Sequence, residues 1–156
     1  MANVKMICFD MDGTIVDFYG VSNWLGMIEN YDPTPYAVAD PLWNMVELVE
    51  TLRKVHEIGI EINIITWLSK GSTKEFDTTV RQVKREWLER HNFPFDHFHG
   101  VAYGATKADS VRKFLAEDET AILFDDNAKV RKGWHLGETV DPTEVNIIEY
   151  LKNLLI

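Results

Sequence analysis

Two aspartates separated by one residue, Asp10 and Asp12, are the first side chains in this 156-residue chain whose type and spacing could do chemistry. They directly follow an apolar run at residues 4–9, which predicts a buried strand. Alternate residues at a strand end point the same way, so both carboxyls can face one site. Two acids this close repel each other unless a shared proton or a cation relieves them, and Mg²⁺ prefers such oxygen ligands. An ordinary turn is the alternative interpretation of this pair.

A hydroxyl and an ammonium group follow two later apolar runs. Thr66 ends the run at residues 61–66, where its hydroxyl could hydrogen-bond a phosphate oxygen, and Ser69 is a nearby rival for that role. Lys107 stands at the start of a predicted helix, where a cation opposes the helix dipole and so suggests a bound anion. An exposed lysine without such a role is an equally common reading.

Two adjacent acids, Asp125 and Asp126, follow the apolar run at residues 120–124. Such a pair after a buried strand is costly unless it is solvated or binds a cation. If this strand lies beside the first one, the pair faces Asp10 and completes a magnesium site.

These groups occur in one order: Asp-X-Asp-Gly-Thr at residues 10–14, then Thr66, Lys107 and the Asp pair. The combination resembles the haloacid dehalogenase superfamily of phosphotransferases, from residue 4 to about residue 140. The segment at residues 10–18 is similar to the start of the 5'(3')-deoxyribonucleotidases, and the chain also looks like small nucleotidase-like proteins of phages and bacteria. The resemblance implies a three-layer Rossmann-like sheet of order 5-4-1-2-3, which puts the first and fourth strands side by side.

The resemblance also implies a Mg²⁺-dependent phosphatase with assigned residue roles. Asp10 would attack the phosphoryl group to give an aspartyl-phosphate, and Asp12 would be the general acid and base. The metal ligands would be Asp10, the backbone oxygen of Asp12 and Asp126, with Asp125 acting instead or assisting. Thr66 and Lys107 would bind phosphate oxygens.

Alternating strand and helix patterns predict an α/β domain with a parallel sheet. A fifth, weaker strand is predicted at residues 138–140, and the third at residues 99–103. Asp40 and Pro41 predict the start of a helix whose apolar residues recur from 42 to 55. Further helices are predicted at residues 79–91, 108–115 and 145–155, the last with a start signal at residues 141–144; residues 84–90 are expected to form a solvated helix face.

Residues 18–39 interrupt this alternation and are predicted to form an inserted flap or minimal cap, because they combine glycines, prolines and five aromatic residues. Phe18 and Trp24 in this segment, together with Trp67, could stack on a nucleobase. Packing within the flap is the equally weighted alternative.

The length favours one domain, residues 1–156. The resemblance implies a small phosphorylated substrate, such as a nucleoside monophosphate. The net charge of −9 disfavours nucleic-acid and anionic membrane partners. The single cysteine, Cys8, excludes an internal disulfide, and we expect a cytoplasmic protein without a membrane span. The competing functions are a phosphatase for a nucleic-acid end or a protein phosphate and a non-catalytic binding protein. The sequence does not indicate an oligomeric state.

Overall fold

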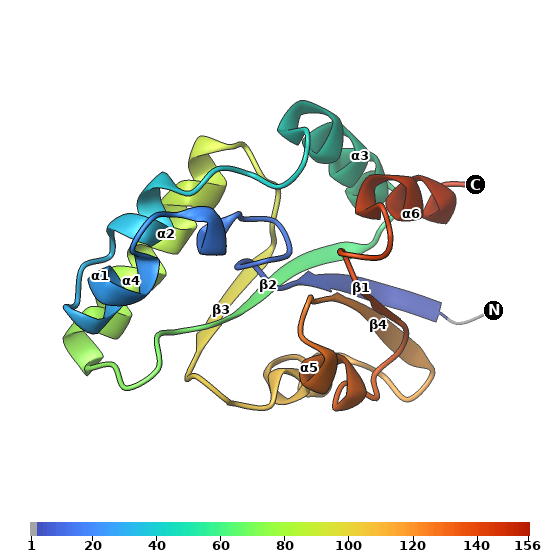
Figure 1. Cartoon of the computed structure of the whole chain (residues 1–156). Coiled ribbons are helices and arrows are strands. Elements are labelled where there is room, and N and C mark those ends of the chain that lie inside the picture. The colour runs from blue at the N-terminus through green and yellow to red at the C-terminus, as the bar shows by residue number, and fades with distance from the viewer. Residues whose placement is uncertain (1–2) are drawn as a thin grey trace.

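The computed structural model, which describes residues 3–156, contains one sheet of five strands with helices on both faces (Figure 1). All neighbouring strands are parallel, in the order β3-β2-β1-β4-β5. This is the predicted order counted from the other edge, so the predicted α/β fold is confirmed. The strands are β1 (Asn3–Phe9), β2 (Glu61–Trp67), β3 (His97–Val101), β4 (Glu119–Phe124) and β5 (Thr139–Val140).

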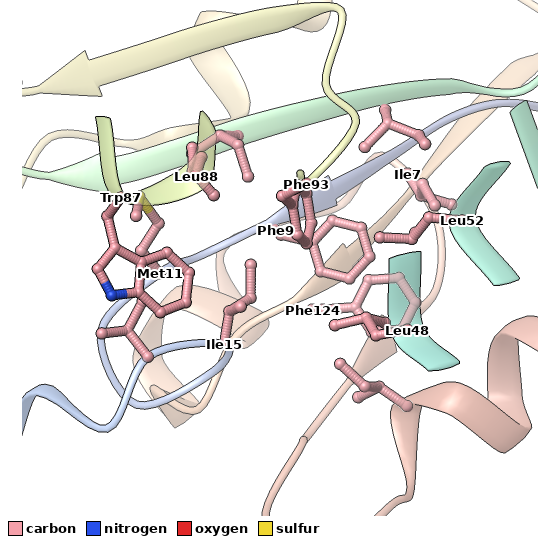
Figure 2. Packing of buried hydrophobic residues seen from close by; sticks show 14 of the residues in the cluster. Ile7, Phe9, Met11, Ile15, Leu48, Leu52, Trp87, Leu88, Phe93 and Phe124 are labelled. Atoms are coloured by element: carbon pink, nitrogen blue, oxygen red, sulfur yellow. The ribbon is translucent and has the colours of Figure 1, made fainter. Parts of the chain in front are cut away.

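Strand β1 occupies the centre of the sheet because its side chains are apolar on both faces. Ile7 and Phe9 belong to the core on one face, Met6 and Cys8 belong to the core on the other, and all four are fully buried. On the first face Phe9 stacks on Phe124 of β4, with ring centroids 4.5 Å apart (Figure 2). Continuous apolar runs are typical of parallel strands covered on both sides, which explains the three layers.

The larger core lies under three helices, and Leu48, Leu52 and Trp87 are among the residues that these helices contribute to it (Figure 2). The smaller core on the opposite face includes Ala108 and Trp134. Within residues 3–156, no helix is both long enough and apolar enough to cross a membrane. The helices over the first face are α3 (Met45–Glu57), α4 (Lys74–Arg90) and α6 (Ile147–Leu154), whereas α5 (Ala128–Lys132) and the 3₁₀ turns Lys107–Ser110 and Arg112–Phe114 lie on the other side.

The predicted start of α3 at Asp40 and Pro41 is wrong, because Asn44 caps this helix through its side chain. The preceding residues instead bridge to the loop after β1. The Leu42 backbone N–H donates a hydrogen bond to the carbonyl of Ile15. This extended pairing removes the segment from the helix.

Two other helix predictions need correction. The helix predicted at residues 108–115 is a pair of 3₁₀ turns, separated by the buried Val111 with non-helical angles (φ −123°, ψ −11°). Helix α6 starts after Asn146, which caps it. Asp141 instead forms a local turn by accepting hydrogen bonds from Thr143.

Strand β3 begins two residues before the predicted run at 99–103. Its register is set by pairing with β2, where His97 lies opposite Asn63. After Val101 the chain leaves the sheet. Tyr103 therefore lies in the loop that follows the strand rather than in the strand itself.

The segment 18–39 forms a 3₁₀ turn, Phe18–Gly20, and two short helices, α1 (Trp24–Glu29) and α2 (Thr34–Val38). Helix α2 packs on α4, and Figure 1 shows α1 and α2 together beside α4. The indole N–H of Trp87 in α4 donates to the carbonyl of Ala39 at 2.8 Å. The segment is thus anchored to the helical layer beside the sheet.

Candidate active site

The predicted chemical groups gather at the carboxyl edge of the sheet. Asp10 follows β1, Thr66 is the penultimate residue of β2, and Asp125 follows β4. Because β1 and β4 are neighbours, Asp10, Asp125 and Asp126 each place one carboxylate oxygen within 4.8 Å of the others. Two segments more than a hundred residues apart therefore form one acidic cluster.

Lys107 connects two of these carboxylates. Its Nζ atom donates hydrogen bonds to Oδ1 of Asp10 at 2.9 Å and to Oδ2 of Asp125 at 2.7 Å, and the residue is 4% exposed. Burial by itself would lower the pKa of Lys107, but Asp10 and Asp125 outweigh it and raise that pKa. Since only a four-residue 3₁₀ turn follows, these two carboxylates, and not a helix dipole, account for the position of the lysine.

Thr14 joins the loop after β1 to the loop after β4. Its hydroxyl donates to Oδ2 of Asp10 at 3.0 Å and accepts from the backbone N–H of Asp126 at 3.2 Å. Gly13 adopts a left-handed conformation (φ +84°), and a Cβ atom there would overlap the Asp126 carboxylate. The glycine thus permits both the turn and the close approach of Asp126.

A buried lysine that the sequence reasoning missed lies beneath Asp12. The prediction that residues 84–90 form a solvated face is wrong, because Lys84 is 1% exposed. Its Nζ atom donates to Oδ2 of Asp12 at 3.0 Å and to Oγ1 of Thr66 at 2.7 Å. Lys84 lies four residues before Leu88 on the buried side of α4, so its place on the apolar stripe was a signal available in the sequence.

The charges of the site do not balance. Four carboxyl groups face two ammonium groups, so two negative charges are left over if every group is ionised. Burial and the charge of Asp10 raise the pKa values of Asp125 and Asp126, and Lys107 opposes this at Asp125. Burial also raises the pKa of Asp12, with Lys84 opposing. This excess negative charge and the carboxylate oxygens suit a divalent cation that prefers oxygen ligands.

A cleft of about 500 Å³ opens above this cluster. Phe18, Trp24 and Trp67, the three predicted base-stacking residues, all line it. Phe18 is nevertheless buried and stacks on Tyr36 at 4.7 Å between ring centroids, so it also packs the flap. Further lining residues, not predicted from the sequence, include Tyr19, Tyr36, Lys70 and Tyr103.

The two hydroxyls considered for phosphate binding differ in position. Thr66 is 1% exposed, and its oxygen accepts the hydrogen bond from Lys84. Ser69 lines the cleft, and its hydroxyl lies 2.7 Å from that of Tyr36. Phosphate binding by Thr66 stays a prediction, and Ser69 is the hydroxyl on the cleft surface.

No protein-family model and no curated protein matches this chain in sequence. Among solved structures, a haloacid dehalogenase-like family hydrolase from Streptococcus pneumoniae is similar at 20% identity and a TM-score of 0.59, over 94% of this chain and 98% of that one. A structure from Mesorhizobium loti, described as a HAD-like phosphatase, gives 12% identity and a TM-score of 0.56, over 99% and 88% of the two chains.

A chain of the Pnkp1/Rnl/Hen1 RNA repair complex is also similar, with 14% identity and a TM-score of 0.59. The match covers 89% of this chain but only 42% of that one, so this chain spans less than half of that protein's length. The likeness to these structures lies in the fold. The chain has the fold of the haloacid dehalogenase-like hydrolases.

Proposed function

We propose that this protein is a Mg²⁺-dependent phosphomonoester hydrolase that acts through an aspartyl-phosphate on a small phosphorylated metabolite. The observation that carries the proposal is the setting of Asp10 at the floor of the cleft. Lys107 and Thr14 each donate to one of its carboxylate oxygens, and Asp12 lines the same cleft two residues away. This setting supports Asp10 as the nucleophile, with Asp12 as the acid and Lys107 as a buried cation beside it.

The acidic cluster supports the magnesium requirement. The carboxylates of Asp10 and Asp126 and the backbone carbonyl of Asp12 would hold the ion. Asp125 belongs to the same cluster and would assist Asp126 or replace it as a ligand. When bound, Mg²⁺ supplies positive charge that stabilises the phosphoryl oxygens.

In the first half of the reaction a carboxylate oxygen of Asp10 attacks the phosphorus atom. The bond between phosphorus and the ester oxygen breaks, and that oxygen takes a proton from Asp12 and leaves as an alcohol. Lys107 lies against the attacking carboxylate and offers its charge to the phosphoryl group as negative charge develops. The raised pKa of Asp12 favours the protonated form that this step needs.

In the second half a water molecule attacks the phosphorus of the aspartyl-phosphate and gives its proton to Asp12. The bond between phosphorus and Asp10 breaks, inorganic phosphate leaves, and both aspartates return to their starting states. Asp12 therefore serves as acid and then as base.

The cleft supports a nucleoside monophosphate as the leading substrate class. Its size falls in the usual range for small-molecule sites. The rings of Trp67 and Tyr103, with centroids 5.1 Å apart, line it together with Phe18, Tyr19 and Trp24. Aromatic faces can stack on a base, and the phosphate would then lie toward Asp10.

Hydrolysis of p-nitrophenyl phosphate, with Mg²⁺ and with EDTA, tests the chemistry. The wild type should be active only with Mg²⁺, Asp10→Asn should be inactive, and the exposed control Asp118→Asn should match the wild type. Acid quenching followed by mass spectrometry should find phosphate on the peptide that contains Asp10. Full activity of Asp10→Asn would disprove the mechanism.

A second experiment separates the substrate classes. One neighbouring fold belongs to an RNA repair complex, so a nucleic-acid end is the competing substrate. Nucleoside monophosphates, sugar phosphates and an oligonucleotide with a terminal phosphate should be compared at equal concentration. The net charge of −9 and the aromatic lining favour the mononucleotides. A strong preference for the oligonucleotide would replace our choice, and inactivity on every ester would favour a binding protein.

A further inference from the structure

Lys84 is the most deeply buried cation whose role the proposed reaction leaves open. Its ammonium has three N–H donors, and the structure supplies three acceptors: Asp12 Oδ2 at 3.0 Å, Thr66 Oγ1 at 2.7 Å and the carbonyl of Trp67 at 2.9 Å. The same atom lies 4.8 Å from the centre of the Tyr36 ring. One side chain of α4 thus contacts the loop after β1, the end of β2 and the flap.

Stability does not explain a lysine at this position. The neighbouring buried residues of α4 are apolar, among them Val80, Trp87 and Leu88. Removing an ammonium from water is costly, and well-packed apolar residues in place of a buried ion pair are often neutral or stabilising. A charged residue at such a site is better explained by a function that is retained at some cost in stability.

The contact that carries a function is the one with Asp12. Aspartate has two rotatable side-chain bonds, and Asp12 lies in a loop at the edge of the cleft rather than in a strand. Lys84 holds one carboxylate oxygen of Asp12 and leaves the other for proton exchange. Because Trp67 and Thr66 fix the ammonium from β2, the position of Asp12 is tied to the sheet.

We propose that Lys84 is a positioning residue, which holds the Asp12 carboxyl where it exchanges a proton with the leaving oxygen. The inference rests on the proposed phosphatase function and deepens it. Lys84 does not touch the reacting atoms. It acts through Asp12, in contrast to Lys107, which bonds the nucleophile itself.

The leaving group provides the test, since p-nitrophenolate leaves without a proton whereas an alkoxide requires one. Lys84→Met keeps the length and apolar stem of the side chain. We expect it to lower kcat for ethyl phosphate by roughly 100-fold, within the usual contribution of general acid catalysis. The formation of the aspartyl-phosphate from p-nitrophenyl phosphate, measured as the pre-steady-state burst, should change by less than about 5-fold on the same reasoning.

Three further variants test whether the effect is specific to the contact between Lys84 and Asp12: Lys74→Met, Asp12→Asn and the double variant Asp12→Asn with Lys84→Met. Lys74→Met introduces the same change at an exposed position of α4 and should behave as the wild type. Asp12→Asn should itself lose the ethyl phosphate reaction, and adding Lys84→Met to it should cause little further loss. If Lys84→Met does not fold, as judged by circular dichroism, Lys84→Gln serves for the same comparison.

Each outcome decides between explanations. In a folded Lys84 variant, a loss in the burst with p-nitrophenyl phosphate as large as the loss in kcat for ethyl phosphate, or no loss in either quantity, would overturn the positioning role. Additive losses in the double variant would overturn it as well, because Lys84 would then act independently of Asp12. If the wild type hydrolyses neither ester, the proposed function fails, and the inference falls with it.

Discussion

The ammonium of Lys107 donates a 2.7 Å hydrogen bond to Asp125, and both side chains are almost fully buried. The same ammonium also bonds Asp10, so one lysine offsets part of the charge on two carboxylates at the floor of the cleft. We therefore expect that Lys107 contributes to the stability of the protein as well as to the chemistry of the site.

Replacing Lys107 by methionine should destabilise the protein that has no metal bound. Loss of one partner from a buried ion pair costs about 3–5 kcal/mol, which corresponds to a decrease of roughly 6–20 °C in the unfolding temperature for a chain of this size. Mg²⁺ should restore more stability to this variant than to the wild type, because the cation replaces the lost charge. Differential scanning calorimetry with Mg²⁺ and with EDTA measures both effects; Lys132→Met, an exposed change, is the control. An unchanged unfolding temperature in EDTA would contradict the prediction.

Asp126→Asn should have opposite effects on stability without and with Mg²⁺. Without the metal the variant should be more stable than the wild type, because a carboxylate near Asp10 and Asp125 is removed. The wild type should gain about 2.7 kcal/mol at a Mg²⁺ concentration 100 times its Kd, and the variant should gain much less. Urea unfolding with Mg²⁺ and with EDTA provides the comparison. Asp118→Asn should keep the wild-type response, and an equal gain in Asp126→Asn would exclude Asp126 as a ligand.

A methyl group at Gly13 should damage the metal site as well as the fold. Gly13 and Gly59 both have positive φ angles, +84° and +96°, so alanine at either costs about 1–2 kcal/mol in backbone strain. At Gly13 the new Cβ atom also overlaps Asp126, whereas at Gly59 no atom lies within 4 Å. Isothermal titration with Mg²⁺ should show weaker binding in Gly13→Ala alone. Identical Mg²⁺ affinities in the two variants would show that the close approach of Asp126 is unimportant.

Tyr103→Ala should weaken the binding of a nucleoside monophosphate and leave the chemistry intact. Tyr103 is exposed, lines the cleft and contacts Trp67, so its ring can stack on a base. Loss of one stacking contact, about 1–3 kcal/mol, should raise KM by about 5- to 150-fold with little change in kcat. A sugar phosphate should be hydrolysed as by the wild type. Phe114→Ala removes an exposed ring outside the cleft and is the control; an unchanged KM in Tyr103→Ala would argue against base stacking there.

His99 should make folding less favourable in acid. Burial, His97 and Lys113 lower the pKa of His99, so the unfolded chain binds its proton more tightly than the folded protein does. The stability that neutral His99 contributes is complete above the unfolded pKa of about 6.5 and is lost as the pH falls from there toward the folded value. Urea unfolding between about pH 7 and pH 5 should therefore show a smaller loss for His99→Gln than for the wild type.

The exposed His135 supplies the control for this comparison. Its φ angle is +54°, a conformation that asparagine tolerates, so His135→Asn should follow the wild-type pH profile. A His99→Gln profile parallel to that of the wild type would contradict the prediction. The two-dimensional NMR titration of the histidine rings gives a direct check, since His99 should titrate below about pH 6.5.

The sequence by itself determined the layers of this fold and the carboxyl ends of β1 and β4. Ile7 and Phe9, alternating with Met6 and Cys8, are apolar on both faces, and a parallel strand covered on both sides buries all four. Asp10, Thr66 and Asp125 were predicted at strand ends because each follows or closes such a run. Parallel strands end at one edge of a sheet, so their assembly there followed from the pattern.

Helix boundaries were less predictable, because more than one residue before each helix could have capped it. Asp40 and Asp141 both stand before a proline and an apolar stripe, yet Asn44 and Asn146 are the caps that form. The backbone near Asp40 is engaged with the loop after β1. That pairing joins segments distant in sequence, which a helical pattern does not encode.

Only the tertiary structure decided which carboxylates the two lysines meet. Lys84 has the composition of a solvated helix residue, but packing of α4 on β2 places its ammonium against Asp12 and Thr66. The same packing leaves Ser69 on the cleft surface and encloses Thr66. Electrostatic energy depends on distance and on burial, and both are properties of the assembled elements. A sequence pattern indicates whether a segment is a helix or a strand. It does not indicate which residue a long side chain contacts on the neighbouring element.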